Sequence, residues 1–303
     1  MTAARLTLML AVALVVALLL ALTLGEVGLT GAQYLEAFRE PGSGPALILW
    51  QVRAPRSVCA LAVGAALGLS GALMQGLLRN PLAEPGVLGV SATASLGGAL
   101  VLVAGAGMVA GAVELAAMAG AGIAAALLIA FAARIRAPAA LILFGVALSS
   151  FAGASTALIF NLSPSPIATA EVMAWLLGSV QNRGWGDVVW VVAALVPAAL
   201  LARLSAPGLR ALSLGDETAR TLGLPLDRRR LLALIAASLA AGAAVAAAGV
   251  IGFVGLVAPH LVRSAVRADP GRILLPSALA GGLILVVADV MTRITPTDQE
   301  LKL

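Results

Sequence analysis

The chain has 303 residues, of which 61% are hydrophobic and only 11% are charged, and its mean hydropathy is +1.06. A soluble domain carries about 25% charged residues, so this composition excludes an ordinary water-soluble protein. The net charge of +5 does not indicate nucleic-acid binding, because the basic residues form no stripe interleaved with aromatic residues. The lone Cys59 excludes an internal disulfide and says nothing about the redox compartment.

Apolar runs long enough to form membrane helices recur along the whole chain. A membrane helix needs about 20 apolar residues, and helices satisfy their own backbone hydrogen bonds in lipid. We predict nine hydrophobic helical segments, near residues 6–24, 56–77, 88–106, 110–133, 139–161, 187–204, 229–249, 250–266 and 273–293. The first is interpreted as a retained helix and not a cleaved signal peptide, and a stretch near 169–178 as a half-helix. The prediction is one all-α, polytopic membrane domain, residues 1–303.

The distribution of basic residues predicts the topology. With a cytoplasmic N-terminus, most of the 19 lysines and arginines fall in inside segments. Six fall outside: Arg39, Arg53, Arg56, Arg183, Arg293 and Lys302. Because basic residues accumulate in cytoplasmic loops, we expect a multi-pass inner-membrane protein with its N-terminus in the cytoplasm.

Several kinds of chemistry have no candidate residues in this chain. A phosphate-binding loop needs a lysine after its glycines, and the single lysine is Lys302, near the end of the chain. Metal sites need clustered His, Cys or carboxylates, and the chain has one His and one Cys, far apart. We therefore expect no catalytic site, no nucleotide site, no metal site and no cofactor.

An autonomous secondary carrier or channel is one possible function for a multi-pass membrane protein, and one carboxylate in a predicted span bears on it. Ion-coupled carriers keep ionisable residues in mid-membrane, and Asp289 lies in the ninth segment. Arg293 follows four residues later, on the same helix face. We interpret the two as a structural ion pair near the outer surface, which favours a passive conduit whose energy comes from elsewhere.

Three stretches are more specific than membrane sequence in general. They are Arg53–Arg56 with Gln75–Ser91 (QGLLRNPLAEPGVLGVS), Leu214–Pro225 (LGDETARTLGLP) and Gly249–Arg263 (GVIGFVGLVAPHLVR). Together they resemble the FecCD-type permeases of bacterial ABC importers, a family that transports iron-siderophore, haem and cobalamin chelates. The resemblance covers nearly the whole chain in order.

The resemblance implies a ten-helix permease fold that works as a homodimer or as a pair of related permeases. It also implies two cytoplasmic ABC ATPase subunits and a periplasmic or lipid-anchored substrate-binding protein. The family pattern continues beyond Gln299–Leu303 into a tenth helix, so we expect nine of the ten spans here and interpret the end as a truncation.

The resemblance also assigns roles to residues. It implies a cytoplasmic coupling loop at about 205–228 that docks on the ATPase; the alternative is a solvated connector. The spacing of Leu214, Ala219 and Leu222, with polar residues between them, favours two short helices broken at a glycine in this loop. The coupling residues are Leu214, Gly215, Asp216, Glu217, Ala219, Arg220, Leu222 and Gly223.

Two further groups are assigned in the same way. Arg53, Arg56 and Arg293 resemble the arginines that dock the binding protein; the alternative is anchoring at lipid headgroups. The cytoplasmic turn or gate comprises Asn80, Pro81, Leu82, Ala83, Pro85, Pro259, His260 and Arg263. His260 by itself is interpreted as a structural hydrogen-bonding residue and not as a ligand.

Overall fold

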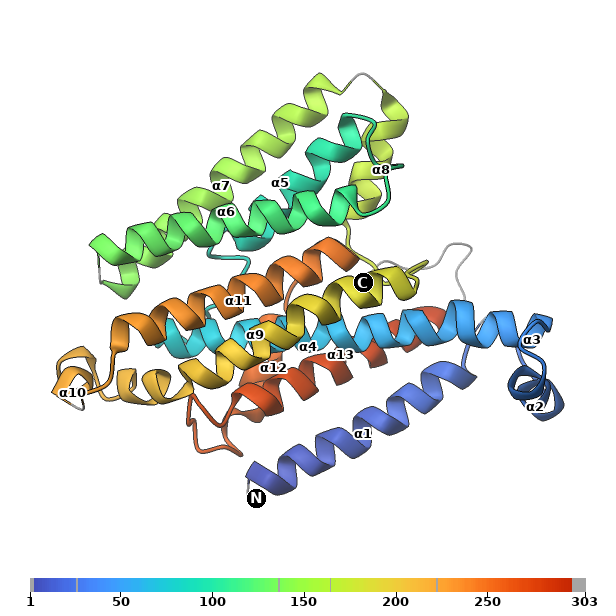
Figure 1. The fold of residues 1–303 in the computed structure, drawn as a ribbon, viewed down its shortest axis with the longest axis horizontal. Coiled ribbons are helices and arrows are strands. Elements are labelled where there is room, and N and C mark those ends of the chain that lie inside the picture. Colours follow the sequence, from blue (N-terminus) through green and yellow to red (C-terminus); the bar gives the residue numbers. More distant parts are fainter. Residues whose placement is uncertain (1–2, 26, 136, 164, 222, 296–303) are drawn as a thin grey trace.

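The computed structural model describes residues 3–25, 27–135, 137–163, 165–221 and 223–295, and its secondary structure there is entirely helical (Figure 1). Seven of the described helices are long and apolar enough to cross a membrane. They are α1 (Ala3–Thr23), the continuous helix Gly44–Leu78, α6 (Ala112–Arg134), α7 (Pro138–Leu162), α9 (Trp185–Leu212), α11 (Leu226–Ala248) and α13 (Leu274–Ile294).

The remaining elements are short. The continuous helix is made of α3 (Gly44–Leu47), the π-helical turn η1 (Ile48–Arg53) and α4 (Ala54–Leu78). The other helices are α2 (Gly31–Arg39), α5 (Val90–Val103), α8 (Pro166–Leu176), α10 (Asp216–Thr221) and α12 (Val254–Arg263).

The predicted all-α polytopic fold is confirmed, and each of the nine predicted segments contains a helix. The count of nine spans is not confirmed, because α5 and α12 are shorter than the roughly 20 residues that a span needs. Glycine-rich backbone limits both helices. Gly105, just after α5, has φ +73°, and the stretch from Gly249 to Phe253 before α12 is not helical.

The end of α9 differs from the prediction. The segment was expected to end at residue 204, ahead of Pro207, but the helix continues through Pro197 and Pro207 to Leu212. Proline is tolerated in membrane helices where neighbouring helices shield the freed backbone. Here α11 packs closely, since a Cβ at Gly208 would overlap the side chain of Arg229. The predicted loop at 205–228 is therefore reduced to residues 213–225, with α10 inside it.

The centre of the bundle is α4, which packs against α13, α11, α12 and α9. Three glycines on α4 allow backbones to touch: a Cβ on Gly64, Gly68 or Gly71 would overlap a carbonyl oxygen of α13 or α12. Small residues permit such close approach between membrane helices. The central position of α4 follows from these glycines.

The other helices lie around this centre and leave two distinct ends. In Figure 1, α1 lies along one edge of the bundle and α5 to α8 form a layer along the opposite edge. One end carries α2 and α3, and the other carries α10, the end of α6 and the start of α7. These are called the α2 end and the α10 end below.

Candidate functional site

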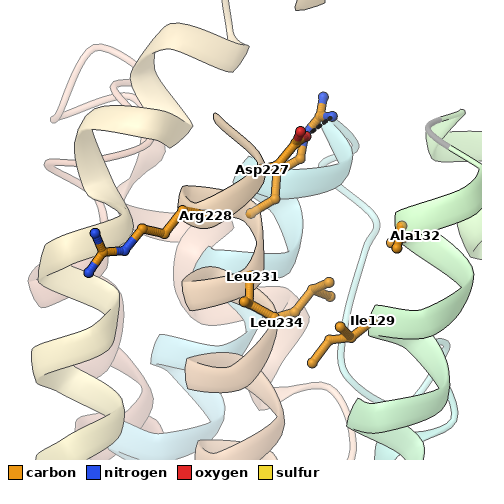
Figure 2. A pocket seen from close by; sticks show the side chains of 8 residues that line it. Ile129, Ala132, Asp227, Arg228, Leu231 and Leu234 are labelled. Atoms are coloured by element: carbon orange, nitrogen blue, oxygen red, sulfur yellow. Dashed lines mark ion pairs between the residues drawn. The ribbon is translucent and has the colours of Figure 1, made fainter. Parts of the chain in front are cut away.

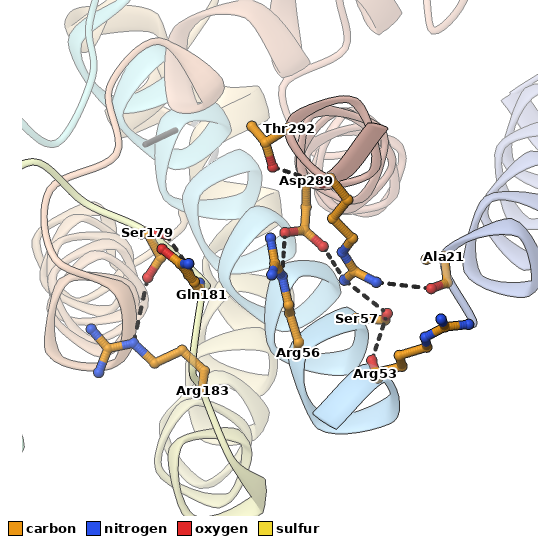
Figure 3. A network of polar contacts seen from close by, with 10 residues as sticks. Ala21, Arg53, Arg56, Ser57, Ser179, Gln181, Arg183, Asp289 and Thr292 are labelled. Atoms are coloured by element: carbon orange, nitrogen blue, oxygen red, sulfur yellow. Dashed lines mark hydrogen bonds and ion pairs between the residues drawn. The ribbon is translucent and has the colours of Figure 1, made fainter. Parts of the chain in front are cut away.

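At the α2 end, a buried carboxylate lies between two arginines from different helices (Figure 3). Asp289 of α13 accepts a hydrogen bond from Nε of Arg56 at 2.8 Å and another from Nη2 of Arg293, one turn later. Arg293 also donates to the carbonyl of Ala21 at 2.8 Å and to Oγ of Ser57 at 3.3 Å. Buried charges persist when they are paired and hydrogen-bonded in this way. The predicted Asp289–Arg293 pair is confirmed.

Arg53 lies beside this network and holds the end of α1. Its Nη1 donates to the carbonyls of Leu22 at 3.0 Å and Thr23 at 3.1 Å, and to the hydroxyl of Tyr34 at 3.0 Å. Its Nη2 donates to the carbonyl of Val27. The last carbonyls of a helix have no partner within the helix, so Arg53 satisfies the C-terminal end of α1.

The three predicted docking arginines do come together, around a cavity of about 350 Å³ that also involves Gln181 and Asn182. Arg53 is 5% exposed and Arg293 is 9% exposed, and their guanidinium groups have partners inside the chain. Anchoring at lipid headgroups requires side chains that extend to the membrane surface. Arg53 and Arg293 are too buried for this role. Their role in docking stays a prediction.

At the α10 end, Asp216 joins three elements. It begins α10 and forms ion pairs with Arg79, which follows α4, at 3.0 Å and with Arg230 of α11 at 2.5 Å. Burial alone would raise the pKa of this carboxyl. The hydrogen bond from Arg230 and the charges of Arg230, Arg79 and Arg220 outweigh burial and lower the pKa. Asp216 is therefore an anion that links α10 to the end of α4 and to α11. This structural role is additional to the coupling role predicted for it.

Four of the predicted coupling residues, Asp216, Glu217, Ala219 and Arg220, lie in one short helix, α10, between two glycines. Gly215 and Gly223 have φ +97° and +70°, a conformation that glycine adopts without steric cost. The expected two short helices are therefore wrong for the described residues, because these glycines bound α10 on both sides. Ala219 is buried against Leu226 of α11. Leu214, Glu217 and Arg220 are exposed, and Leu222 lies outside the described residues.

The predicted tight turn after α4 is present. Asn80 accepts a hydrogen bond from the backbone N–H of Leu82 at 2.9 Å, a local turn typical of asparagine. Arg79 ends α4 in the left-handed conformation, at φ +50°. Ala83 is buried and Leu82 is exposed, on either side of Pro81 and ahead of Pro85. The turn therefore projects an apolar side chain from the α10 end.

A second cavity lies next to this turn. Nη2 of Arg263 donates to Oε1 of Gln75 at 2.8 Å, and Gln75 donates to the carbonyl of Leu256 at 3.3 Å. Gln75, Asn80 and Arg263 line a cavity of about 210 Å³. Two residues of the predicted gate, Asn80 and Arg263, therefore line the same cavity, together with Gln75, which was not predicted as a site residue. Sequence reasoning missed Gln75 because its partner lies 188 positions away.

The remaining gate residues are divided. Pro259 is buried within α12, whereas His260 is exposed and makes no side-chain hydrogen bond in the described part of the chain. The expectation that His260 is a structural hydrogen-bonding residue is therefore wrong there. Its position in the last turn of α12 turns it away from the buried side of that helix.

These features define a class of protein: a multi-pass helical membrane protein whose bundle carries a charged site at each end. The FecCD transport family matches residues 13–303. The chain belongs to this family, so the resemblance seen in the sequence is confirmed.

Similar proteins cover nearly the whole chain. The vitamin B12 import system permease proteins BtuC of Salmonella paratyphi A and Salmonella typhi are each 40% identical over 299 residues, which is 98% of this chain and 89% of theirs. A solved structure described as an inward-facing conformation of a metal-chelate type ABC transporter is also similar. Its TM-score is 0.88 at 29% identity, over 98% of this chain and 93% of that one.

Proposed function

We propose that this chain is the permease subunit of a binding-protein-dependent ABC importer in the inner membrane, with its N-terminus in the cytoplasm. The observation that carries the proposal is the 40% identity to vitamin B12 import permeases over 98% of the chain. The substrate is cobalamin or another metal chelate, such as an iron siderophore or haem. The proposed unit is one transmembrane domain, residues 1–303, with the catalytic chemistry in partner subunits.

A second permease subunit is supported by α7. This helix has an exposed face that combines apolar residues with Ser150 and Asn161, which lie on the same side of the helix. Polar residues within a span face a partner or a water-filled cavity more readily than lipid. A second copy, or a related permease, placed against α7 would cover this face and enclose a pathway between the two subunits.

The two ends then have separate partners. At the α10 end, the exposed Leu214, Glu217 and Arg220 offer a contact surface to a cytoplasmic ATPase subunit. At the α2 end, the positive charges of Arg53, Arg56 and Arg293 exceed the one negative charge of Asp289 between them, and this excess would attract acidic side chains of a binding protein to the cavity that they line. Charge complementarity of this kind orients a partner and speeds encounter. Alternating access would link the two ends, with ATP hydrolysis in the partner subunits.

Transport into liposomes tests this proposal against an autonomous carrier. The chain is reconstituted alone, and together with the ATPase and binding protein of its own importer. We expect cobalamin or ferric-siderophore uptake only with both partners and ATP. Uptake by the chain alone, driven by an ion gradient, would favour the carrier. In the structure the buried Asp289 is already paired with two arginines, which disfavours ion coupling there.

A matched pair of glycine variants tests the coupling segment. Gly223→Val and Gly105→Val both place a β-branched residue at a positive φ, with no atom within 4 Å of the new Cβ. The backbone cost is therefore similar. We expect Gly223→Val to lower ATP-driven uptake by about tenfold or more and Gly105→Val, far from α10, to leave uptake near normal. Equal uptake by the two variants would remove the coupling assignment.

A further inference from the structure

The seam between α6 and α11 opens toward the α10 end. Near its closed end the helices touch, since a Cβ on Gly242 would lie 2.5 Å from the Cβ of Ala121. Beyond this contact the seam holds a cavity of about 130 Å³, beside Gly122 and Ser238, and then a wider one of about 350 Å³. The two cavities follow one another along the same pair of helices and form a tapering groove.

The groove has apolar walls along its length. On α6 its lining runs from Met118 to Ala133, at spacings of three, four or seven residues that keep to one helix face. Ile129, Leu231 and Leu234 line the wide part, as Figure 2 shows. At 1.5 Å per residue the stripe on α6 is about 22 Å long. One leaflet, half of the roughly 30 Å hydrocarbon core, is about 15 Å deep, so the groove can hold an acyl chain.

The wide end of the groove is basic. Arg134 ends α6 and Arg228 is in the first turn of α11; both are exposed and neither makes an ion pair with a described residue. Arg230 and Asp227 also line this end, but Asp216 and Asp227 share the charge of Arg230. Figure 2 shows Arg228 on the side of α11 away from α6. A headgroup would therefore lie over the end of α11, with its chain in the groove.

We infer that this groove binds one anionic phospholipid of the leaflet at the α10 end. An acyl chain fills the space between α6 and α11, and the phosphate lies over the first turn of α11 at Arg228, with Arg134 at the end of α6 adding to the positive charge of this end. Basic residues at a membrane surface attract anionic headgroups, and an apolar groove is filled favourably by hydrocarbon. The lipid would support the wide part of the seam, immediately beside the helix that continues from the coupling segment.

Native mass spectrometry of the detergent-solubilised full chain tests this inference, with dioleoyl phosphatidylglycerol and dioleoyl phosphatidylcholine as probes. We expect one phosphatidylglycerol to be retained about fivefold more strongly than phosphatidylcholine. The double variant Arg134→Gln/Arg228→Gln should reduce this preference to none. Arg267→Gln, an exposed arginine of the α12–α13 connection at the same end, should leave it unchanged.

A plug variant tests the groove separately from the charge. Nothing lies within 4 Å of a Cβ at Gly122, so Gly122→Leu can fill the narrow cavity while the fold is preserved. It should abolish the tightly held lipid and keep the wild-type melting temperature. Equal retention of the two lipids by the wild type would overturn the inference. So would undiminished phosphatidylglycerol in a folded Gly122→Leu variant, or a second copy of the chain occupying the seam.

Discussion

The 18-residue apolar windows of the helix Gly44–Leu78 and of α7 have the same mean hydropathy, 1.9, yet 83% of the first window and 11% of the second is buried. Hydropathy identifies both as membrane helices and does not distinguish the centre of the bundle from its periphery. The distinction lies in the small residues. Gly68 on α4 touches the backbone of α13, whereas a Cβ at Gly153 on α7 would meet nothing within 4 Å.

The physical reason is the solvent. Lipid tails are as apolar as leucine, so apolar side chains alone give membrane helices little reason to associate. Close backbone packing at small residues supplies the attraction instead. The large apolar residues of α7, such as Phe151 and Leu162, therefore stay exposed in the single chain. The exposed apolar face of α7 is therefore available to lipid or to a partner subunit.

Matched leucine substitutions at the two glycines should give the largest effect. Gly68→Leu would drive its Cβ into the carbonyl of Ser277, with no flexible side chain to yield. We expect a loss of more than about 4 kcal/mol, or no folded protein. Gly153→Leu should change stability by about 0.5 kcal/mol or less. Size-exclusion profiles and melting temperatures in detergent measure both. Similar profiles for the two variants would contradict the central role of α4.

Disrupting the ion pairs that link α4 to α13 through Asp289 should give the next largest effect. Asp289→Asn removes the charge that Arg56 and Arg293 share inside the bundle. Removing one partner of a buried charge pair costs about 3 to 5 kcal/mol. Glu40→Gln, an exposed carboxylate at the same end, is the control and should be nearly neutral. Thermal unfolding in detergent measures the difference, and a loss below about 1 kcal/mol would mean that the network contributes little.

Much of the fold could be predicted because membrane helices reveal themselves by length and hydropathy. The ends of α9 and the pairing of Arg56 with Asp289 could not be predicted from the sequence. Pro207 marks a break in water but not in a packed bundle. Arg56 and Asp289 are 233 positions apart, and no local pattern specifies such a pair. The Asp289–Arg293 pair could be predicted because a helix places residues four apart side by side.

Cysteine accessibility sharpens the contrast between buried and exposed faces. The native Cys59 on α4 is fully buried, and Ser150 on α7 is exposed. Thiols react as thiolates and need access to water. We expect maleimide to label Ser150→Cys at least about tenfold faster than Cys59. The labelling rate at Ser150→Cys should also exceed that at Ile123→Cys, an exposed apolar position on α6. Equal rates at 150 and 123 would place α7 in lipid and argue against a water-filled pathway beside it.

The smallest effect concerns acid and the ion pairs at the α10 end. The pKa of Asp269, like that of Asp216, is lowered although burial would raise it, because Arg210 and the backbone N–H groups of Arg272 and Gly271 donate hydrogen bonds to it. A carboxyl whose native pKa lies below its unfolded value of 3.8 stabilises the fold fully above that pH. This stability is lost as the pH falls from 3.8 through the lowered native pKa.

Melting temperatures from pH 7 to pH 3 test whether the stability that Asp216 contributes is lost as the pH falls. The Asp216→Asn variant should be less stable than the wild type at pH 7, by about 1 kcal/mol or less because the pair is partly exposed. The difference should shrink below pH 3.8, where the wild type loses the same charge. Glu217→Gln, its exposed neighbour, is the control and should follow the wild type at every pH. A constant difference across the range would mean that Asp216 acts through packing and not through its charge. In that case the contacts of Asp216 would stabilise the fold by packing, as the glycines of α4 do. The α10 end could then no longer be contrasted with the centre of the bundle as a region held together by charge.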